Sequence, residues 1–228
     1  MHTVNDVLHR LHKLARPENL EGMARFGMET EKRLGIPVPE MRKLAKDIGK
    51  NHPLALELWK SGIAEARIVA SMIADPAQLT AEVMEDWVKD FNSWDVCDQV
   101  CMNLFDKSEL AWLKVQEWNH RDEEFVKRAA FALIACLAWH QKDTEDQKFI
   151  ELLPLTIEQA TDPRNFVKKS ISCALRHIGK RNKILHREAL RTARQIRKID
   201  AKPARWIASD VIRELENPKI KERLGLTS

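Results

Sequence analysis

The chain has 228 residues, of which 44% are hydrophobic and 32% are charged, a composition typical of a soluble globular protein with a large core. Its seven glycines form no glycine-rich tract, which argues against a nucleotide-binding loop, and no segment approaches the roughly 20 apolar residues of a membrane span. The polar start, residues 1–6, lacks the apolar core of a secretory signal, so we expect a cytoplasmic protein.

The basic residues behind the net charge of +4 are concentrated in one part of the chain. Between Arg164 and Arg205, 14 Lys and Arg residues stand against only two acids, Glu188 and Asp200. Such a segment suits a face that binds a polyanion, because each phosphate neutralised by Lys or Arg releases a condensed counterion. A well-solvated basic helical surface is the alternative explanation.

Apolar residues repeat with the period of an α-helix from the start of the chain. Val4, Leu8, Leu11 and Leu14 keep a spacing of three to four residues before an Arg-Pro break. A second stop, Gly-Ile-Pro-Val-Pro, places Pro39 in the first turn of the next helix. No segment shows sustained polar–apolar alternation between hairpin turns, so we expect an all-α protein.

Four segments resemble one another and have the character of the second helix of a pair. Taking Val126, Val167 and Ala204 as equivalent gives spacings of 41 and 37 residues, which suit HEAT-type repeats. We therefore expect one domain over residues 1–228, a superhelical α-solenoid curved around a concave face. A bundle of unrelated helices is the alternative. The four segments are residues 66–70, 126–133, 167–175 and 204–208.

Basic residues open the first turns of these helices, at Lys127 and Arg128, at Lys168 and Lys169, and at Arg205. In a solenoid such cations stack along one line, so we expect a concave basic face. Helix amino termini facing the same way would add partial positive charge and N–H donors for phosphates.

The segment from Arg176 to Lys183 ends one of these helices, and we expect Gly179 to stop it in the left-handed conformation. Its cations, among them Arg176, Lys180 and Arg181, would then reach a DNA backbone. A solvated helix end explains them equally well.

The polar junction at residues 91–100 carries one indole and two carboxylates. If a helix begins there, Trp94 and Asp98 stand four residues apart on one face, so a large ring and an anion share one surface. Asp95 is the residue that we expect to cap the helix or stabilise its dipole. The shared surface suits a cationic nucleotide in DNA.

Several segments in the correct order resemble the AlkD-like DNA alkylation repair family, which are HEAT-like DNA glycosylases. The resemblance covers about residues 15–215, nearly the whole chain, and several separate matches make it specific. The matching segments are Asn92–Asp98, Glu124–Ala130, Asp162–Lys169 with Ala174–Arg176, and the amino-terminal Gly22–Phe26 and Leu34–Arg42.

This resemblance implies excision of purines alkylated at N3 or N7 from double-stranded DNA, without drawing the base into a deep pocket. Asp98 matches the family's catalytic aspartate, which stabilises oxocarbenium character on the sugar and orients water. Trp94 matches the tryptophan that packs on the deoxyribose of the lesion. Arg128 matches an arginine that contacts the nearby backbone. We expect no cofactor and no obligate protein partner.

One position departs from the family pattern. Where the family commonly has a second tryptophan, this sequence has Cys173, which is far smaller and has no aromatic face. Either a neighbouring residue fills the gap, or activity is weakened or shifted in substrate, or the protein binds DNA shape without cutting. A HEAT scaffold that binds acidic peptides is a further alternative.

The remaining aromatic and sulfur residues are interpreted as structural. Cys97 and Cys101 flank Asp98, but no second ligand pair stands at zinc-site spacing, so we expect no metal site. With Cys136 and Cys173 they lie in apolar helical patterns, as reduced and mostly buried thiols do. The tryptophans that we expect to pack between repeats are Trp59, Trp87, Trp112, Trp118, Trp139 and Trp206.

Overall fold

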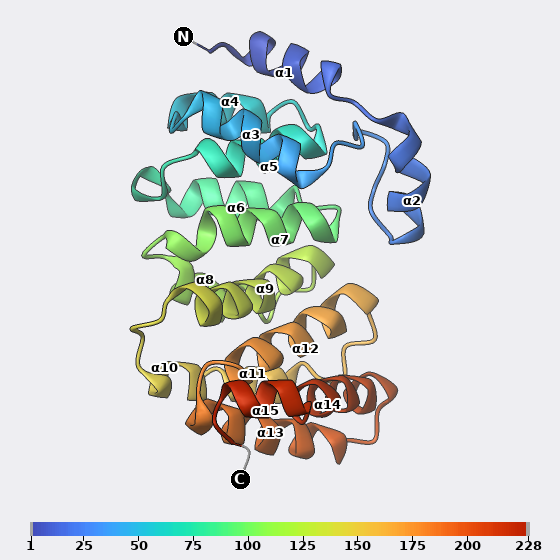
Figure 1. The fold of residues 1–228 in the computed structure, drawn as a ribbon, viewed down its shortest axis with the longest axis vertical. Coiled ribbons are helices and arrows are strands. Elements are labelled where there is room, and N and C mark those ends of the chain that lie inside the picture. Colours follow the sequence, from blue (N-terminus) through green and yellow to red (C-terminus); the bar gives the residue numbers. More distant parts are fainter. Residues whose placement is uncertain (1, 227–228) are drawn as a thin grey trace. The chain divides into compact units, whose positions relative to one another are not determined.

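A computed structural model describes residues 2–226, and every regular element within that range is helical (Figure 1). The predicted all-α class is therefore confirmed. The chain forms two compact units, Met1–Ala111 (unit 1) and Trp112–Ser228 (unit 2). That both belong to one domain stays a prediction.

Unit 1 is a stack of short helices, of which α5 packs on α3, α4 and α7. The Arg-Pro break and the start of α3 fall where the sequence predicts, and Pro39 lies in the first turn of α3. Short 3-10 turns cover Pro17–Asn19, Pro76–Gln78 and Phe105–Lys107. The helices are α1 (Val4–Lys13), α2 (Leu20–Arg25), α3 (Val38–Ile48), α4 (His52–Trp59), α5 (Ala64–Ile73), α6 (Ala81–Lys89) and α7 (Trp94–Asn103).

The loop before α3 is held by a buried carboxylate from α5. Glu65 is fully buried and accepts hydrogen bonds from the backbone N–H groups of Leu34, Gly35 and Ile36, at 3.0, 2.8 and 3.2 Å. Charge-assisted bonds of this kind compensate the desolvation of the buried anion. Gly35 has a φ of +77°, and a Cβ there would lie 2.2 Å from the carbonyl oxygen of Arg16.

Unit 2 contains the predicted repeat. Helices α9, α12 and α14 begin 41 and 37 residues apart, and α12 packs against both of the others. The predicted spacing is therefore confirmed. Helix α8 (Ala111–Trp118) leads into unit 2, whose other helices are α9 (Glu124–His140), α10 (Asp146–Ile150), α11 (Leu153–Glu158), α12 (Asn165–Gly179), α13 (Lys183–Arg197), α14 (Lys202–Leu215) and α15 (Pro218–Arg223).

The prediction that Gly179 stops a helix in the left-handed conformation is wrong. Gly179 is the last residue of α12, and its φ is not positive. A Cβ at this position would lie 2.6 Å from Cδ1 of Leu215 and 3.0 Å from Cβ of Ala189. The glycine is needed because α12, α13 and α14 approach closely at that point.

Four of the six tryptophans assigned to packing are buried or half-buried, but two are exposed. Trp59 and Trp87 stack in the core of unit 1, with ring centroids 3.9 Å apart and planes within 5°. Trp139 and Trp206, by contrast, are 51% and 38% exposed, so the packing prediction is wrong for both. Trp139 lies in the last turn of α9 and Trp206 in the first turns of α14, where side chains of α12 cover them only in part.

Candidate active site and nucleic-acid interface

Helix α7 begins at the predicted junction, with Ser93 as the N-cap residue and Trp94 as its first residue. Asp95 lies in the first turn, as expected of a dipole-stabilising residue, but it does not cap the helix. Its two carboxylate oxygens accept bonds of 2.7 and 2.9 Å from the guanidinium of Arg33, and the Ser93 hydroxyl donates a third at 2.6 Å. The Arg33 side chain is 2% exposed, so this ion pair fixes the start of α7 from inside unit 1.

Trp94 and Asp98 are both half-exposed on α7, one turn apart. The indole N–H of Trp94 donates a 3.0 Å hydrogen bond to the backbone carbonyl of Phe26, which orients the ring. Phe26 itself is 75% exposed, so the residue whose carbonyl binds Trp94 also presents an aromatic side chain on the surface of unit 1. Sequence comparison marked Phe26 as part of a matching segment but gave it no role.

The predicted DNA-binding residues belong to unit 2, and two of them are buried. Lys127 is 8% exposed, donates a 2.9 Å bond to Oε1 of Gln159 and lies 3.6 Å from the carboxylate of Asp162. Arg128 is 7% exposed and donates a 2.7 Å bond to the carbonyl of Phe166 in the first turn of α12. Both side chains therefore tie α9 to the region around α12.

Arg176 and Lys180 meet on one acid of α14. Both donate to the carboxylate of Glu214, and Arg176 also lies 3.5 Å from Asp210. The basic segment around α12 is thus partly neutralised by acids from the next repeat, which the local charge count did not include.

Arg181 caps the carboxyl-terminal end of α9. Its two Nη atoms donate to the carbonyls of Ala138 and Gln141, at 2.8 and 3.0 Å, and to those of Lys142 and Thr144, both at 3.1 Å. Burial lowers the pKa of Arg181, but the group stays charged at neutral pH. Arg181 therefore binds one carbonyl in the last turn of α9 and three in the segment that follows it.

The other predicted DNA contacts lie nearer the surface of unit 2. The ammonium of half-buried Lys168 is 5.0 Å from the ring centroid of Trp206, a cation–π distance. Lys169 is exposed, and Arg205 is exposed with a 2.7 Å ion pair to Asp200. Cys173 is half-exposed on α12, whereas Cys97, Cys101 and Cys136 are buried as predicted.

Further exposed cations of the basic segment lie along α13 and at its C-cap, and among them only Lys183 belonged to a segment that was predicted to reach DNA. We call them the α13 stripe. Four-residue and three-residue spacings bring most of them to one helical face. The sequence signal for this face is the helical period of α13, in which the apolar residues form the buried face and the cations lie at the positions between them. The stripe comprises Lys183, Arg187, Arg191, Arg194, Arg197 and Lys198.

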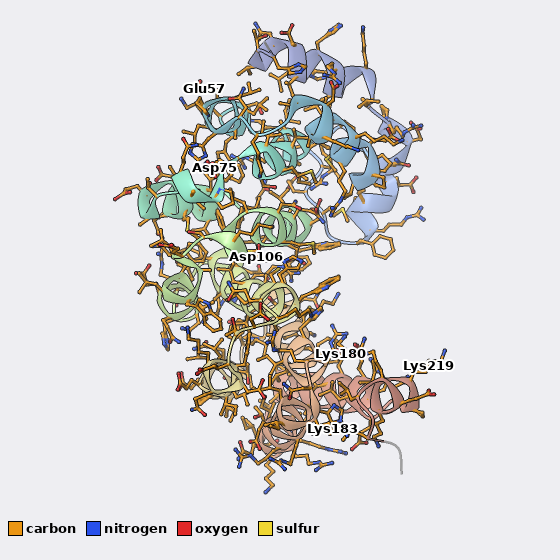
Figure 2. All side chains as sticks on the ribbon, turned by 60° about the vertical axis from the view of Figure 1, so that its left-hand side comes forward. Glu57, Asp75, Asp106, Lys180, Lys183 and Lys219 are labelled. Atoms are coloured by element: carbon orange, nitrogen blue, oxygen red, sulfur yellow. The ribbon has the colours of Figure 1, made fainter. Side chains whose placement is uncertain are left out.

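Charge also differs between the units. Unit 1 has 14 basic and 18 acidic residues, whereas unit 2 has 24 and 16. Figure 2 labels three acidic residues of unit 1, Glu57, Asp75 and Asp106, and three lysines of unit 2, Lys180, Lys183 and Lys219. Unit 2 is therefore the part with the stronger general attraction for a polyanion.

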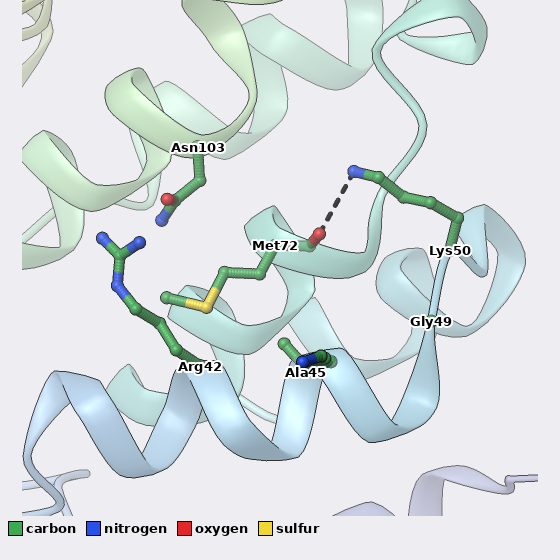
Figure 3. Close-up of a pocket in the computed structure, with 7 residues that line it drawn as sticks. Arg42, Ala45, Gly49, Lys50, Met72 and Asn103 are labelled. Carbon is green, nitrogen blue, oxygen red and sulfur yellow. Dashed lines mark hydrogen bonds between the residues drawn. The ribbon is translucent and has the colours of Figure 1, made fainter.

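Unit 1 nevertheless contains a basic pocket with a volume of about 410 Å³. It is lined by Arg42 and Lys46 of α3 and by Lys50, Met72 and Asn103. Figure 3 shows the Arg42 guanidinium and the Asn103 amide facing each other across it. Lys50 donates to the carbonyls of Met72 and Ala74, at 3.1 and 2.6 Å, and burial together with Lys107 lowers its pKa.

Among residues 2–226, no group of three or more His, Cys, Asp or Glu side chains is placed to hold a metal ion. Over the same residues, no helix has the length and apolar character needed to cross a membrane.

The fold is shared with a known class of helical-repeat proteins. A solved structure from a family related to the HEAT-like repeat DNA glycosylases, with affinity for branched DNA structures, is similar with a TM-score of 0.77. The two sequences are 19% identical, and the match covers 99% of this chain and 97% of that one. The fold is therefore a solenoid of HEAT-like repeats, as predicted, while its concave basic face stays a prediction.

The family follows from the sequence itself. The model of the DNA alkylation repair enzyme family matches residues 7–215, so the chain belongs to that family, as the resemblance predicted. A designed armadillo repeat protein in complex with the peptide (KR)4 matches at 17% identity over 81% of this chain and 78% of that one. Its TM-score of 0.39 is below the level of a shared fold. No curated protein in the comparison matches the sequence.

Proposed function

We propose that this protein is a DNA glycosylase that releases purines alkylated at N3 or N7 from double-stranded DNA. The observation that carries the proposal is the start of α7, where Trp94 and Asp98 lie one turn apart on a helix whose first turn is fixed by the Arg33–Asp95 ion pair. A fixed carboxylate beside a fixed indole suits a reaction that develops positive charge on a sugar.

In this reaction, hydrolysis of the C1′–N bond, the main contribution of the protein is electrostatic stabilisation. An alkylated purine is already cationic, so it leaves with the electron pair of the C1′–N bond and becomes neutral. The carboxylate of Asp98 stabilises the oxocarbenium character that remains at C1′ and accepts the proton of the attacking water. The face of Trp94 packs on the deoxyribose and favours its cationic character.

The missing family tryptophan at Cys173 leaves one wall of this clamp to other residues. Phe26 is the exposed aromatic side chain whose own backbone carbonyl holds the Trp94 indole. We assign it to the second wall beside the lesion. The duplex itself would be held through phosphates by unit 2, chiefly by Lys169, Arg205 and the α13 stripe. Location in the cytoplasm, with its DNA, is part of the same proposal.

The direct test is release of free base. The protein is incubated with duplex DNA that carries 7-methylguanine, and the released base is measured by chromatography. We expect release by the wild type and none above background by Asp98→Asn. Release that is absent from the wild type, or equal in both proteins, would contradict the assignment.

The second candidate is a non-catalytic binder of distorted or branched DNA. It is favoured by Cys173 and by the similarity to a protein with affinity for branched DNA structures. This function gives salt-sensitive binding without base release, and Asp98→Asn then changes neither. The two candidates are therefore separated by the release assay.

A further inference from the structure

A pocket of unit 2 combines the exposed ring of Trp139 and the half-buried ring of His177 with several cations. It has a volume of about 530 Å³, within the range of about 300–1,000 Å³ that small-ligand sites occupy. Two of its walls are the rings of Trp139, at the end of α9, and His177, near the end of α12. Their ring centroids are 5.5 Å apart with planes inclined by 31°, so the two rings pack against each other at the wall of the pocket.

The polar wall of this pocket is basic. Lys142, Lys180, Arg181 and Arg223 line it, and Lys142 and Arg223 are exposed. Neither Lys142 nor Arg223 forms an ion pair with any residue of the described chain, whereas the Lys180 ammonium is bound to Glu214. Two cations are thus available at the rim for an anionic group.

Helix carboxyl termini normally repel anions, and this pocket lies beside the end of α9. Here that effect is offset, because Arg181 donates to the carbonyl of Ala138 in the last turn of α9 and to three carbonyls of the segment that follows the helix. The guanidinium also lies 4.2 Å from the ring centroid of Phe149, which fixes its position below the pocket. The positive electrostatic potential at the rim of the pocket therefore comes from Lys142 and Arg223.

We infer that this pocket binds one unpaired nucleotide of a branched or frayed DNA, with the base stacked on Trp139 and the phosphate held by Lys142 and Arg223. Every base has a π face, so stacking on an exposed indole tolerates any sequence, and basic side chains beside it track the backbone. A base within an intact duplex is stacked on its neighbours and cannot make this contact. The inference rests on the proposed DNA binding, but it does not require base release.

The state of His177 is compatible with stacking. Its pKa is lowered to about 4, mainly by burial and also by the nearby charges of Lys180, Arg176 and Lys142. The carboxylate of Glu214 acts in the opposite direction. The ring is therefore neutral at pH 7, and its flat apolar face lies beside the indole.

The test compares two DNAs that differ only in an unpaired end. Fluorescence anisotropy gives the affinity of the full-length protein for a duplex and for the same duplex carrying a short single-stranded oligo(dT) flap, at one salt concentration. We expect the wild type to bind the flap DNA more tightly. Trp139→Ala should weaken binding to the flap DNA by about 5- to 100-fold, to the level of the duplex, and leave duplex binding unchanged.

Three variants make the result specific. Trp139→Phe keeps an aromatic face and should restore most of the flap preference, while Lys142→Gln with Arg223→Gln should remove it. Trp206→Ala is the matched control, because Trp206 is also an exposed tryptophan of unit 2. Equal affinity of the wild type for both DNAs, or the same loss in Trp139→Ala and Trp206→Ala, would overturn the inference. Failure of the wild type to bind either DNA would instead overturn the proposed function as well.

Discussion

Asp95 and Asp98 lie three residues apart on α7, and their surroundings separate a structural role from a proposed catalytic one. Asp95 is bound to an arginine whose side chain is 2% exposed. Removing one partner of a buried ion pair leaves the other charge without compensation. Sequence reasoning assigned Asp95 a structural role but not its partner, because Arg33 lies 62 residues away and no local pattern links the two.

We expect Asp95→Asn to lower the free energy of unfolding by about 3–5 kcal/mol. Urea denaturation followed by circular dichroism measures this change. Glu57→Gln is the control, because it removes one partner of an exposed pair with Lys60 and should cost less than about 1 kcal/mol. Equal losses in the two variants would show that Arg33 and Asp95 do not stabilise unit 1 in this way.

His177 gives unit 2 a pH dependence of known sign. Its pKa is about 4 in the folded protein, because burial disfavours the charged ring and Lys180 and Arg176 repel it. The unfolded chain takes up a proton near pH 6.5, so the folded state loses stability as pH falls from 6.5 towards 4 and is unaffected by this group above that window.

We expect His177→Gln to reduce the slope of unfolding free energy against pH by up to about 1.4 kcal/mol per pH unit, only within that window. Urea titrations at pH 7, 6 and 5 measure the slope, since these values cover the acidic side of the group's ordinary pKa. Identical slopes for the variant and the wild type would contradict the assignment.

At the scale of elements, the repeat helices were predictable and their closest contacts were not. The period of apolar residues located α9, α12 and α14 with their spacing, since each must bury one face against its neighbours. The prediction for Gly179 was wrong because the sequence pattern of a glycine at a helix end is the same in two cases. The glycine can adopt a left-handed conformation that ends the helix, or it can leave room for a closely packed neighbouring helix. The exposure of Trp139 was missed for a similar reason, since an indole in an apolar pattern resembles a core residue.

The loop from Leu34 to Ile36 gives the sharpest test at this scale. Gly35→Ala combines a positive φ with a Cβ that would lie 2.2 Å from a backbone oxygen, so the loop must move and the bonds to Glu65 must weaken. We expect a loss of about 2 kcal/mol or more in unfolding free energy. Gly22→Ala is the control, because it lies within α2 with nothing within 4 Å of the added Cβ, and it should stabilise by about 0.5–1 kcal/mol. A neutral Gly35→Ala would refute this account of the loop.

For the whole molecule, the charge count correctly marked the basic segment, but not which of its cations reach solvent. Arg176, Lys180 and Arg181 bind groups inside unit 2, whereas the α13 stripe is exposed. Sequence alone could not separate them, because the internal partners are backbone carbonyls and side chains from other helices.

The exposed stripe should carry much of the salt dependence of DNA binding. In Arg191→Gln with Arg194→Gln, we expect the slope of log affinity against log salt concentration to fall by about 1 for each phosphate contact that is lost. Lys60→Gln in the acidic unit 1 is the control and should leave the slope unchanged. If the double variant keeps the wild-type slope, DNA does not contact this face.

The central claim is that Asp98 stabilises the transition state and does not merely help to bind DNA. The most direct measurement is the single-turnover rate of 7-methylguanine release at saturating protein, for the wild type and Asp98→Asn, with duplex affinity measured alongside. We expect the variant to lose about 100- to 1,000-fold in rate, as when one electrostatic stabiliser is removed, with affinity within about twofold of wild type. Equal rates, or a rate loss that disappears once binding is saturated, would contradict the claim.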